Sequence, residues 1–293
     1  MMRRILFFIL FISTCFSASA QQIFLDSAIY YYQNSKLPEA KAQIEKAVND
    51  AQTINNPYAW YFRGIIYKGL YKQNRPADSL LTLRVEAANS FTKSIELDTN
   101  NEYEVENMKN LRFIGVTFFD DANLMLNERK FELSQKCFNL FKSTMKLADP
   151  SINIKEEEIK YFLSVASTYN HIYNQSDNKL VEYLDKAKDT YNKVIKTDPD
   201  NLLANYNMGI IYYNQAVRII QSLEVSLDIL AFREAEDEVI ALFKKSLPFI
   251  EIGYQAAPDD KNIVEALYEI YYSLNDEEKS GEFKKKIDDL KKD

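Results

Sequence analysis

The chain has 293 residues, of which 46% are hydrophobic and 27% are charged, and its formal net charge is −7. This length and hydrophobic content suffice to bury a core, as one extended domain or two small ones. The negative charge argues against nucleic acid and anionic membrane surfaces as partners, because both attract basic proteins.

The first segment in chain order, residues 1–20, has the three parts of a secretory signal peptide. Two arginines precede the apolar stretch Ile5–Phe16, and small residues follow at positions 18–20. A membrane-spanning helix needs about 20 apolar residues, and this stretch is shorter. We expect cleavage after residue 20, export to the periplasm or cell envelope of a Gram-negative bacterium, and no integral membrane span afterwards. A retained anchor and lipid attachment at Cys15 are the disfavoured alternatives.

Cleavage would remove two arginines and no acidic residue, so the net charge would change from −7 to −9. This charge favours a partner with basic flanks. Cys137 would be the single remaining cysteine. No internal disulfide could then form, and the exported protein would be stable through packing alone.

Further along the chain, a helical pattern repeats. The stretches "WYFRGIIYKGL" and "YNMGIIYYNQA" both place a glycine before Ile-Ile-Tyr, at Gly64 and Gly209. Apolar residues at spacings of three and four around each glycine predict amphipathic helices, in which glycine costs about 1 kcal/mol relative to alanine. A second helical pattern, alanine followed four residues later by an aromatic residue, recurs at Ala87 and Ala187.

Together these patterns resemble the tetratricopeptide repeat: an aromatic residue, a small residue four later, an aromatic three later, then alanine, aromatic, small residue and terminal proline. The resemblance implies an all-α fold, an α-α superhelix (solenoid) of about six helical hairpins. It gives repeats at residues 21–55, 56–100 with an insertion, 101–150, 151–200 with an insertion, 201–259 with a long insertion, and 260–293 as a closing hairpin or cap. The signal, the many Tyr, Asn and Lys residues and the stretch "NPYAWYFRGIIY" also resemble exported tetratricopeptide proteins of Bacteroidetes-type bacteria.

The small residue of the pattern lies where the two helices of a hairpin cross closely. Gly209 is therefore expected to tolerate alanine but not leucine. Asp and Asn in "TDPDN" and "APDDKN" are expected to cap the helices that follow. Pro38 and Pro248 are expected in first helical turns. The insertion before Ser246 keeps apolar helical spacing, so it can lengthen both of its flanking helices.

Few residues could support catalysis. The single histidine, His171, would have to serve any serine or cysteine nucleophile, and no Cys/His cluster can bind zinc. No glycine-rich phosphate loop is present. Carboxylate runs such as "KEEEIK" and "REAEDEV" leave a paired-acid hydrolase as an alternative, although such runs are typical of solvated helix faces. We expect no enzyme activity, no metal and no cofactor, a solvated or groove-lining His171, and a buried structural thiol at Cys137.

The tetratricopeptide resemblance implies a concave face lined mainly by the first helix of each hairpin. Its candidate partner-binding residues are Tyr61, Phe62, Ile65, Lys68, Phe119, Asn123, Asn170, Tyr206, Ile210 and Tyr213. We expect a protein or peptide to bind there, because aromatic anchors dominate many interfaces. A glycan or small ligand stacked on the same rings is one alternative, and simple packing between repeats is another. Some family members hold a terminal carboxylate with Lys and Asn, but Lys68 is the sole lysine at these positions, so that clamp is not expected.

Overall fold

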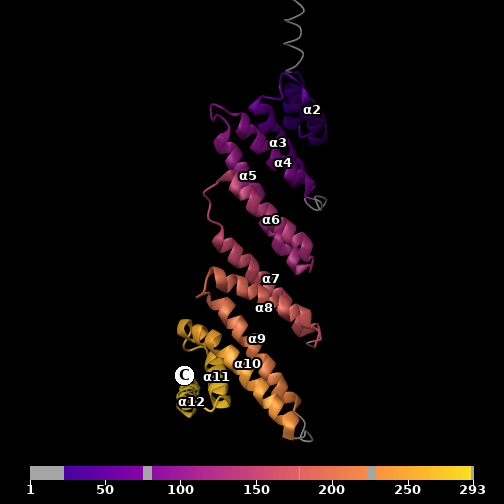
Figure 1. Cartoon of the computed structure of the whole chain (residues 1–293). Coiled ribbons are helices and arrows are strands. Elements are labelled where there is room, and N and C mark those ends of the chain that lie inside the picture. Colours follow the sequence, from indigo (N-terminus) through magenta and orange to yellow (C-terminus); the bar gives the residue numbers. More distant parts are fainter. Residues whose placement is uncertain (1–22, 75–80, 178, 224–228, 292–293) are drawn as a thin grey trace, which may run out of the picture. The chain divides into compact units, whose positions relative to one another are not determined.

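The computed structural model describes residues 23–74, 81–177, 179–223 and 229–291 (Figure 1). The predicted signal peptide lies outside these ranges. Every regular element within them is a helix, so the prediction of an all-α fold is confirmed. The chain forms two compact units, which we call the N-terminal unit (Met1–Asn153) and the C-terminal unit (Ile154–Asp293).

The N-terminal unit contains three helical hairpins in its described part. They pair residues 23–33 with α2 (Leu37–Asn49), α3 (Pro57–Gln73) with α4 (Thr82–Leu97), and α5 (Glu104–Asn127) with α6 (Phe131–Ala148). Successive hairpins pack through α2 with α3 and α4 with α5. Each helix therefore contacts its neighbours in the chain, as in an α-α solenoid.

The C-terminal unit follows the same plan. Its hairpins pair α7 (Lys155–Gln175) with α8 (Val181–Thr197), α9 (Leu202–Ser222) with α10 (Ile229–Ala256), and α11 (Lys261–Ser273) with α12 (Glu277–Leu290). They join through α8 with α9 and α10 with α11. One core, which includes Phe243, Ile250 and Leu267, runs through α9 to α12.

Helix starts follow local chemistry. The side chains of Asn201 and Asp260 accept hydrogen bonds from backbone N–H groups in the first turns of α9 and α11, which confirms the predicted caps. Asn56 does the same for α3, with Pro57 as its first residue. The run "KEEEIK" opens α7, where its carboxylates lie at the positive end of the helix dipole. This position explains the acidic run without any catalytic role.

The expectation for Pro248 is wrong. This proline lies inside α10, which starts far upstream at Ile229 and has 28 residues. The insertion before Ser246 continues α10 toward its N-terminus, so the first turn of the helix is no longer next to the proline. Its continuation into α10 confirms that the insertion lengthens this helix.

The glycines mark close helix crossings, as expected. A Cβ atom on Gly64 would lie 2.4–2.7 Å from ring atoms of Phe91. A Cβ on Gly209 would lie 2.6 Å from Ile250 Cδ1 and 3.2 Å from the Ile250 backbone nitrogen. Because these distances are below normal contact, Ile250 would have to shift to admit alanine at Gly209, and the tolerance of alanine there stays a prediction. The hydroxyl of Ser246 also donates a 2.8 Å hydrogen bond to the Gly209 carbonyl across the crossing.

Candidate partner-binding faces

Three tyrosine rings meet in the N-terminal unit, where α3 passes the start of α5. The ring centroids of Tyr61 and Tyr103 are 5.6 Å apart with an interplanar angle of 23°, those of Tyr58 and Tyr61 are 6.2 Å apart, and those of Tyr58 and Tyr103 are 5.5 Å apart. Each residue is partly exposed. We call Tyr58, Tyr61 and Tyr103 the tyrosine cluster.

Local structure explains why these rings converge. Tyr58 and Tyr61 lie three residues apart on α3, so both point to one side of the helix. Tyr103 directly precedes α5, and its backbone N–H donates a 2.6 Å hydrogen bond to the Asp98 carboxylate. Burial, followed by the nearby charge of Glu106, raises the pKa of Tyr61. The Tyr58 and Tyr61 hydroxyls form no hydrogen bond with any residue that the structure describes, which leaves both groups available to a ligand.

Phe62 has a different environment from its neighbour Tyr61. Its side chain is 8% exposed, and its ring lies edge-on to Tyr32, with centroids 5.3 Å apart. It also packs under Tyr58, at 6.0 Å. The structure thus places Phe62 in the core, where it supports the tyrosine cluster from beneath. Ile65, one turn beyond Tyr61, is partly exposed.

Lys68 lies further along α3 and is tied to α5. Its ammonium group donates a hydrogen bond to the Asn110 side-chain oxygen. Burial, and then repulsion from Lys72, lowers its pKa. Both lysines lie near the Phe113 ring, with their Nζ atoms 5.8 Å and 4.9 Å from its centroid. Neither forms an ion pair with an acidic residue in the described ranges, so this end of α3 is positively charged.

A partly buried ion-pair network links α3 to its neighbouring helices. Arg63 lies 2.8 Å from the Glu45 carboxylate on α2 and 2.7 Å from the Glu86 carboxylate on α4. Its guanidinium also donates to Ser90 Oγ at 2.6 Å. Because Arg63 links both neighbouring helices, α3 presents Tyr58 and Tyr61 from a rigid support.

The other two candidates in this unit are Phe119, which packs against the partner helix of its hairpin, and Asn123, one turn further along α5. The Phe119 ring is 5.0 Å from the Phe141 ring on α6 and is partly exposed. The Asn123 amide donates a 3.1 Å hydrogen bond to the Phe119 carbonyl. These contacts favour a role of both side chains in packing the helices. Their exposed atoms remain candidates for partner binding.

Four candidates belong to the C-terminal unit. Tyr206, Ile210 and Tyr213 form a stripe on α9 that packs partly against the core shared with α11. The Tyr213 hydroxyl donates to the Glu269 carboxylate, and burial together with this bond raises the pKa of Tyr213. Asn170 on α7 is partly exposed and forms no side-chain hydrogen bond with a described residue.

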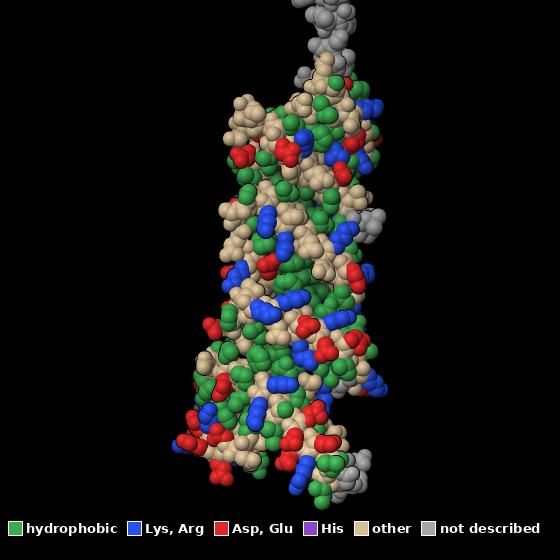
Figure 2. Space-filling model, viewed as in Figure 1, with side chains coloured by type: hydrophobic (Ala, Val, Ile, Leu, Met, Phe, Trp, Pro, Cys, Tyr) green, Lys and Arg blue, Asp and Glu red, His purple; other side chains and the backbone are tan. Residues whose placement is uncertain are grey.

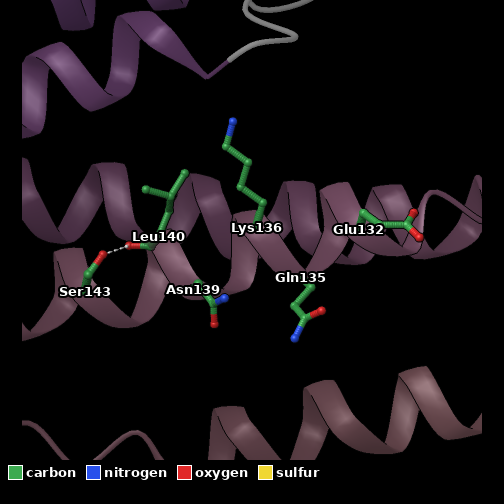
Figure 3. Close-up of a pocket in the computed structure, with 6 residues that line it drawn as sticks. All are labelled: Glu132, Gln135, Lys136, Asn139, Leu140 and Ser143. Atoms are coloured by element: carbon green, nitrogen blue, oxygen red, sulfur yellow. Dashed lines mark hydrogen bonds between the residues drawn. The ribbon is translucent and has the colours of Figure 1, made fainter. Parts of the chain in front are cut away.

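Figure 2 shows hydrophobic side chains at the surface of both units, among basic and acidic ones. One shallow depression is lined by Glu132, Gln135, Lys136, Asn139, Leu140 and Ser143 (Figure 3). All six belong to α6, and Figure 3 shows several of them pointing away from one another. This depression is an open helix face rather than an enclosed binding cavity.

The residues considered for chemistry lie apart from any reactive grouping. Burial, and then the charge of Asp121, raises the pKa of Cys137 to about 11, so its thiol stays protonated at neutral pH and suits a structural role. His171 is exposed and has no hydrogen bond with a described residue. Within the described ranges, no group of His, Cys, Asp or Glu could hold a metal ion, and no helix has the length and apolar character to cross a membrane.

Sequence reasoning missed Tyr58, Tyr103, Lys72 and Glu269. Tyr58 could have been found from its spacing of three to Tyr61. Tyr103 precedes the first helix of its repeat, outside the helical pattern, so its position depends on the Asp98 contact. Lys72 follows Lys68 by four residues, which places both on one helix face.

No protein-family model and no curated protein sequence matches the chain. Solved structures similar to it include human IFIT1 as a dimer with m7Gppp-AAAA, at 14% identity and a TM-score of 0.36, over 89% of this chain and 58% of that chain. They also include PilW, a widely conserved type IV pilus biogenesis factor, at 14% identity and a TM-score of 0.27, over 90% of each chain. The chain thus spans 58% of the IFIT1 chain. The fold assignment rests on the helix pairing described above.

Proposed function

We propose that the protein is a non-catalytic scaffold that binds a protein or peptide segment through the tyrosine cluster. The observation that carries this proposal is that the three partly exposed rings of the tyrosine cluster contact one another and pack on the buried rings of Phe62 and Phe91. By contrast, Tyr191 is 1% exposed and serves the core. Rigid tyrosines offer a large contact area at little cost in conformational entropy.

An extended or helical segment would insert an apolar side chain against these rings. The unbonded hydroxyls of Tyr58 and Tyr61 would then bind its backbone. Ile65 continues the apolar surface along α3, and Lys68 with Lys72 would meet an acidic group at its far end. A tetratricopeptide-type scaffold with this face needs no cofactor.

Removal of one ring tests the proposal. We expect Tyr61→Ala and Tyr103→Ala each to reduce the free energy of binding to a captured partner by about 2 kcal/mol or more, because central aromatic anchors carry most of the binding energy. The partner is first captured from envelope extract with residues 21–293 as bait, then purified and titrated. Tyr61→Phe keeps the ring and loses only the hydroxyl, so it should weaken binding by less than Tyr61→Ala, by about 0.5–1.5 kcal/mol.

Tyr30→Ala is the matched control, since Tyr30 is 61% exposed on residues 23–33, outside the cluster. Melting temperatures separate lost binding from lost folding. Folded Tyr61→Ala and Tyr103→Ala variants that bind at full strength would move the site elsewhere. Binding to a glycan array that depends on Tyr61, without any protein partner, would replace this proposal with the glycan alternative.

We also propose that the protein acts in the periplasm or cell envelope, in keeping with its resemblance to exported tetratricopeptide proteins of Bacteroidetes-type bacteria. The support is the signal pattern in residues 1–20. The intact mass of the protein recovered from its native envelope should match a chain that begins at residue 21. A mass that retains Met1, or that includes lipid on Cys15, would contradict this expectation.

A further inference from the structure

A second face in the C-terminal unit combines tyrosines with carboxylates. On α9, Tyr206, Ile210 and Tyr213 recur at spacings of four and three and lie on one side of the helix. On α11, Glu265, Glu269 and Tyr272 have the same spacings. We call these six residues the α9–α11 face.

One hydrogen bond and two charge effects connect these stripes. The Tyr213 hydroxyl donates to Glu269, and Glu265 also lies close enough to raise the pKa of Tyr213. At the other end of the face, burial, and then the charge of Asp260, raises the pKa of Tyr206. The two helices therefore run in the same direction, with tyrosine rings along one side and carboxylates along the other.

The carboxylates of this face differ from neighbouring acids in their ion pairing. Glu251 pairs with Lys279 and Asp259 with Lys286, at 3.8 Å and 3.2 Å. Glu265 and Glu269 form no ion pair with any basic residue that the structure describes. Lys261, one turn before Glu265 on the same helix, is exposed and does not pair with it. Two negative charges thus remain uncompensated beside aromatic rings.

Tyr272 gives this face an open aromatic edge. Its side chain is 67% exposed. Its ring lies 6.1 Å from the Tyr268 ring, which limits its motion. A planar cation could stack on such a ring while it binds a carboxylate one turn away.

We propose that the α9–α11 face binds an arginine side chain within the partner segment. The guanidinium would pair with Glu265 and Glu269 and stack on Tyr272 or Tyr213, and its aliphatic stem would lie along Ile210. Charge complementarity favours this occupant over an acidic or neutral segment. The inference rests on the proposed peptide-binding function and adds the residue type that this unit selects.

A phage library of short random peptides, selected on residues 21–293, tests the inference. Peptides selected by the native chain should be enriched in arginine. Selection on Glu265→Gln/Glu269→Gln should lose this enrichment, because glutamine keeps the shape and still accepts the Tyr213 hydrogen bond. Glu234→Gln/Glu238→Gln is the matched control: it makes the same charge change at two exposed positions on α10 and should retain the enrichment.

A synthetic peptide from the selection then allows a double-mutant cycle. Replacement of its arginine by glutamine should weaken binding to the native chain about tenfold, and should have little effect on the Glu265→Gln/Glu269→Gln variant. Selected peptides without arginine enrichment, or with enrichment that survives the double variant, would overturn this inference and leave peptide binding intact. Failure of the folded native chain to select any peptide would instead count against the proposed function itself.

Discussion

Asp121→Ala should lower the free energy of unfolding of the N-terminal unit by about 3–5 kcal/mol, because it removes a carboxylate that pairs with a buried guanidinium. Arg84 on α4 is 1% exposed, and its Nη2 atom lies 2.6 Å from Asp121 Oδ2 on α5. The guanidinium lies between the rings of Tyr71 and Phe118, at 4.5 Å and 4.7 Å from their centroids. Water has little access to a charge in this position.

Denaturant unfolding of the variant can be followed in this unit alone. Trp60 is the single tryptophan and lies on α3, so its fluorescence reports the N-terminal unit. Cys137 on α6 is buried, and its alkylation provides a second probe of the same unit. Both probes should show unfolding at lower denaturant concentration in Asp121→Ala than in the native chain.

Asp120→Ala is the matched control. Asp120 is the exposed neighbour of Asp121 on α5, and its replacement should change stability by less than about 0.5 kcal/mol. Arg84→Met/Asp121→Ala should recover much of the loss, since apolar residues often replace buried ion pairs at little cost. Equal stability of Asp121→Ala and Asp120→Ala would show that the pair contributes little.

The ion pair also illustrates what sequence reasoning could not reach. Arg84 closes the stretch "QNRPADSLLTLR", which looks like a polar insertion. Its burial depends on Thr117 and Asp121, which are distant in sequence. The helices themselves were predictable because apolar residues at spacings of three and four are local information. Partner residues across a helix contact are not.

In the candidate site, too, the helix was predictable from local sequence, whereas the contacts between helices were not. Tyr61 and Phe62 are adjacent, and the repeat pattern assigns both to the binding face. Successive residues on an α-helix are rotated by about 100°, however, so one side chain is partly exposed while the other enters the core. Tyr103 joins Tyr61 through a loop contact with Asp98. Periodicity identified the helix, and the packing of its neighbours determined which residues remain at the surface.

Replacement of a glycine at a close helix crossing should also change stability strongly. Gly64→Ala should destabilise the N-terminal unit by about 1–3 kcal/mol through overpacking, although alanine favours the helix by about 1 kcal/mol. All three atoms nearest to the added Cβ belong to the Phe91 ring, at 2.4–2.7 Å. Phe91 is 0% exposed, so its rigid ring has no free space into which to move.

Gly69→Ala is the matched control on the same helix. Its Cβ would lie 3.2 Å from a terminal methyl group of Leu37, which can shift slightly, so we expect a change near zero. Trp60 fluorescence during denaturant unfolding compares the two variants directly. Phe91→Leu should relieve part of the cost of Gly64→Ala, because leucine lacks the ring atoms that collide. The stability of the double variant should therefore exceed the value expected if the two single effects added. Strict additivity, or equal stability of the Gly64→Ala and Gly69→Ala variants, would mean that Phe91 does not set the need for glycine at this crossing.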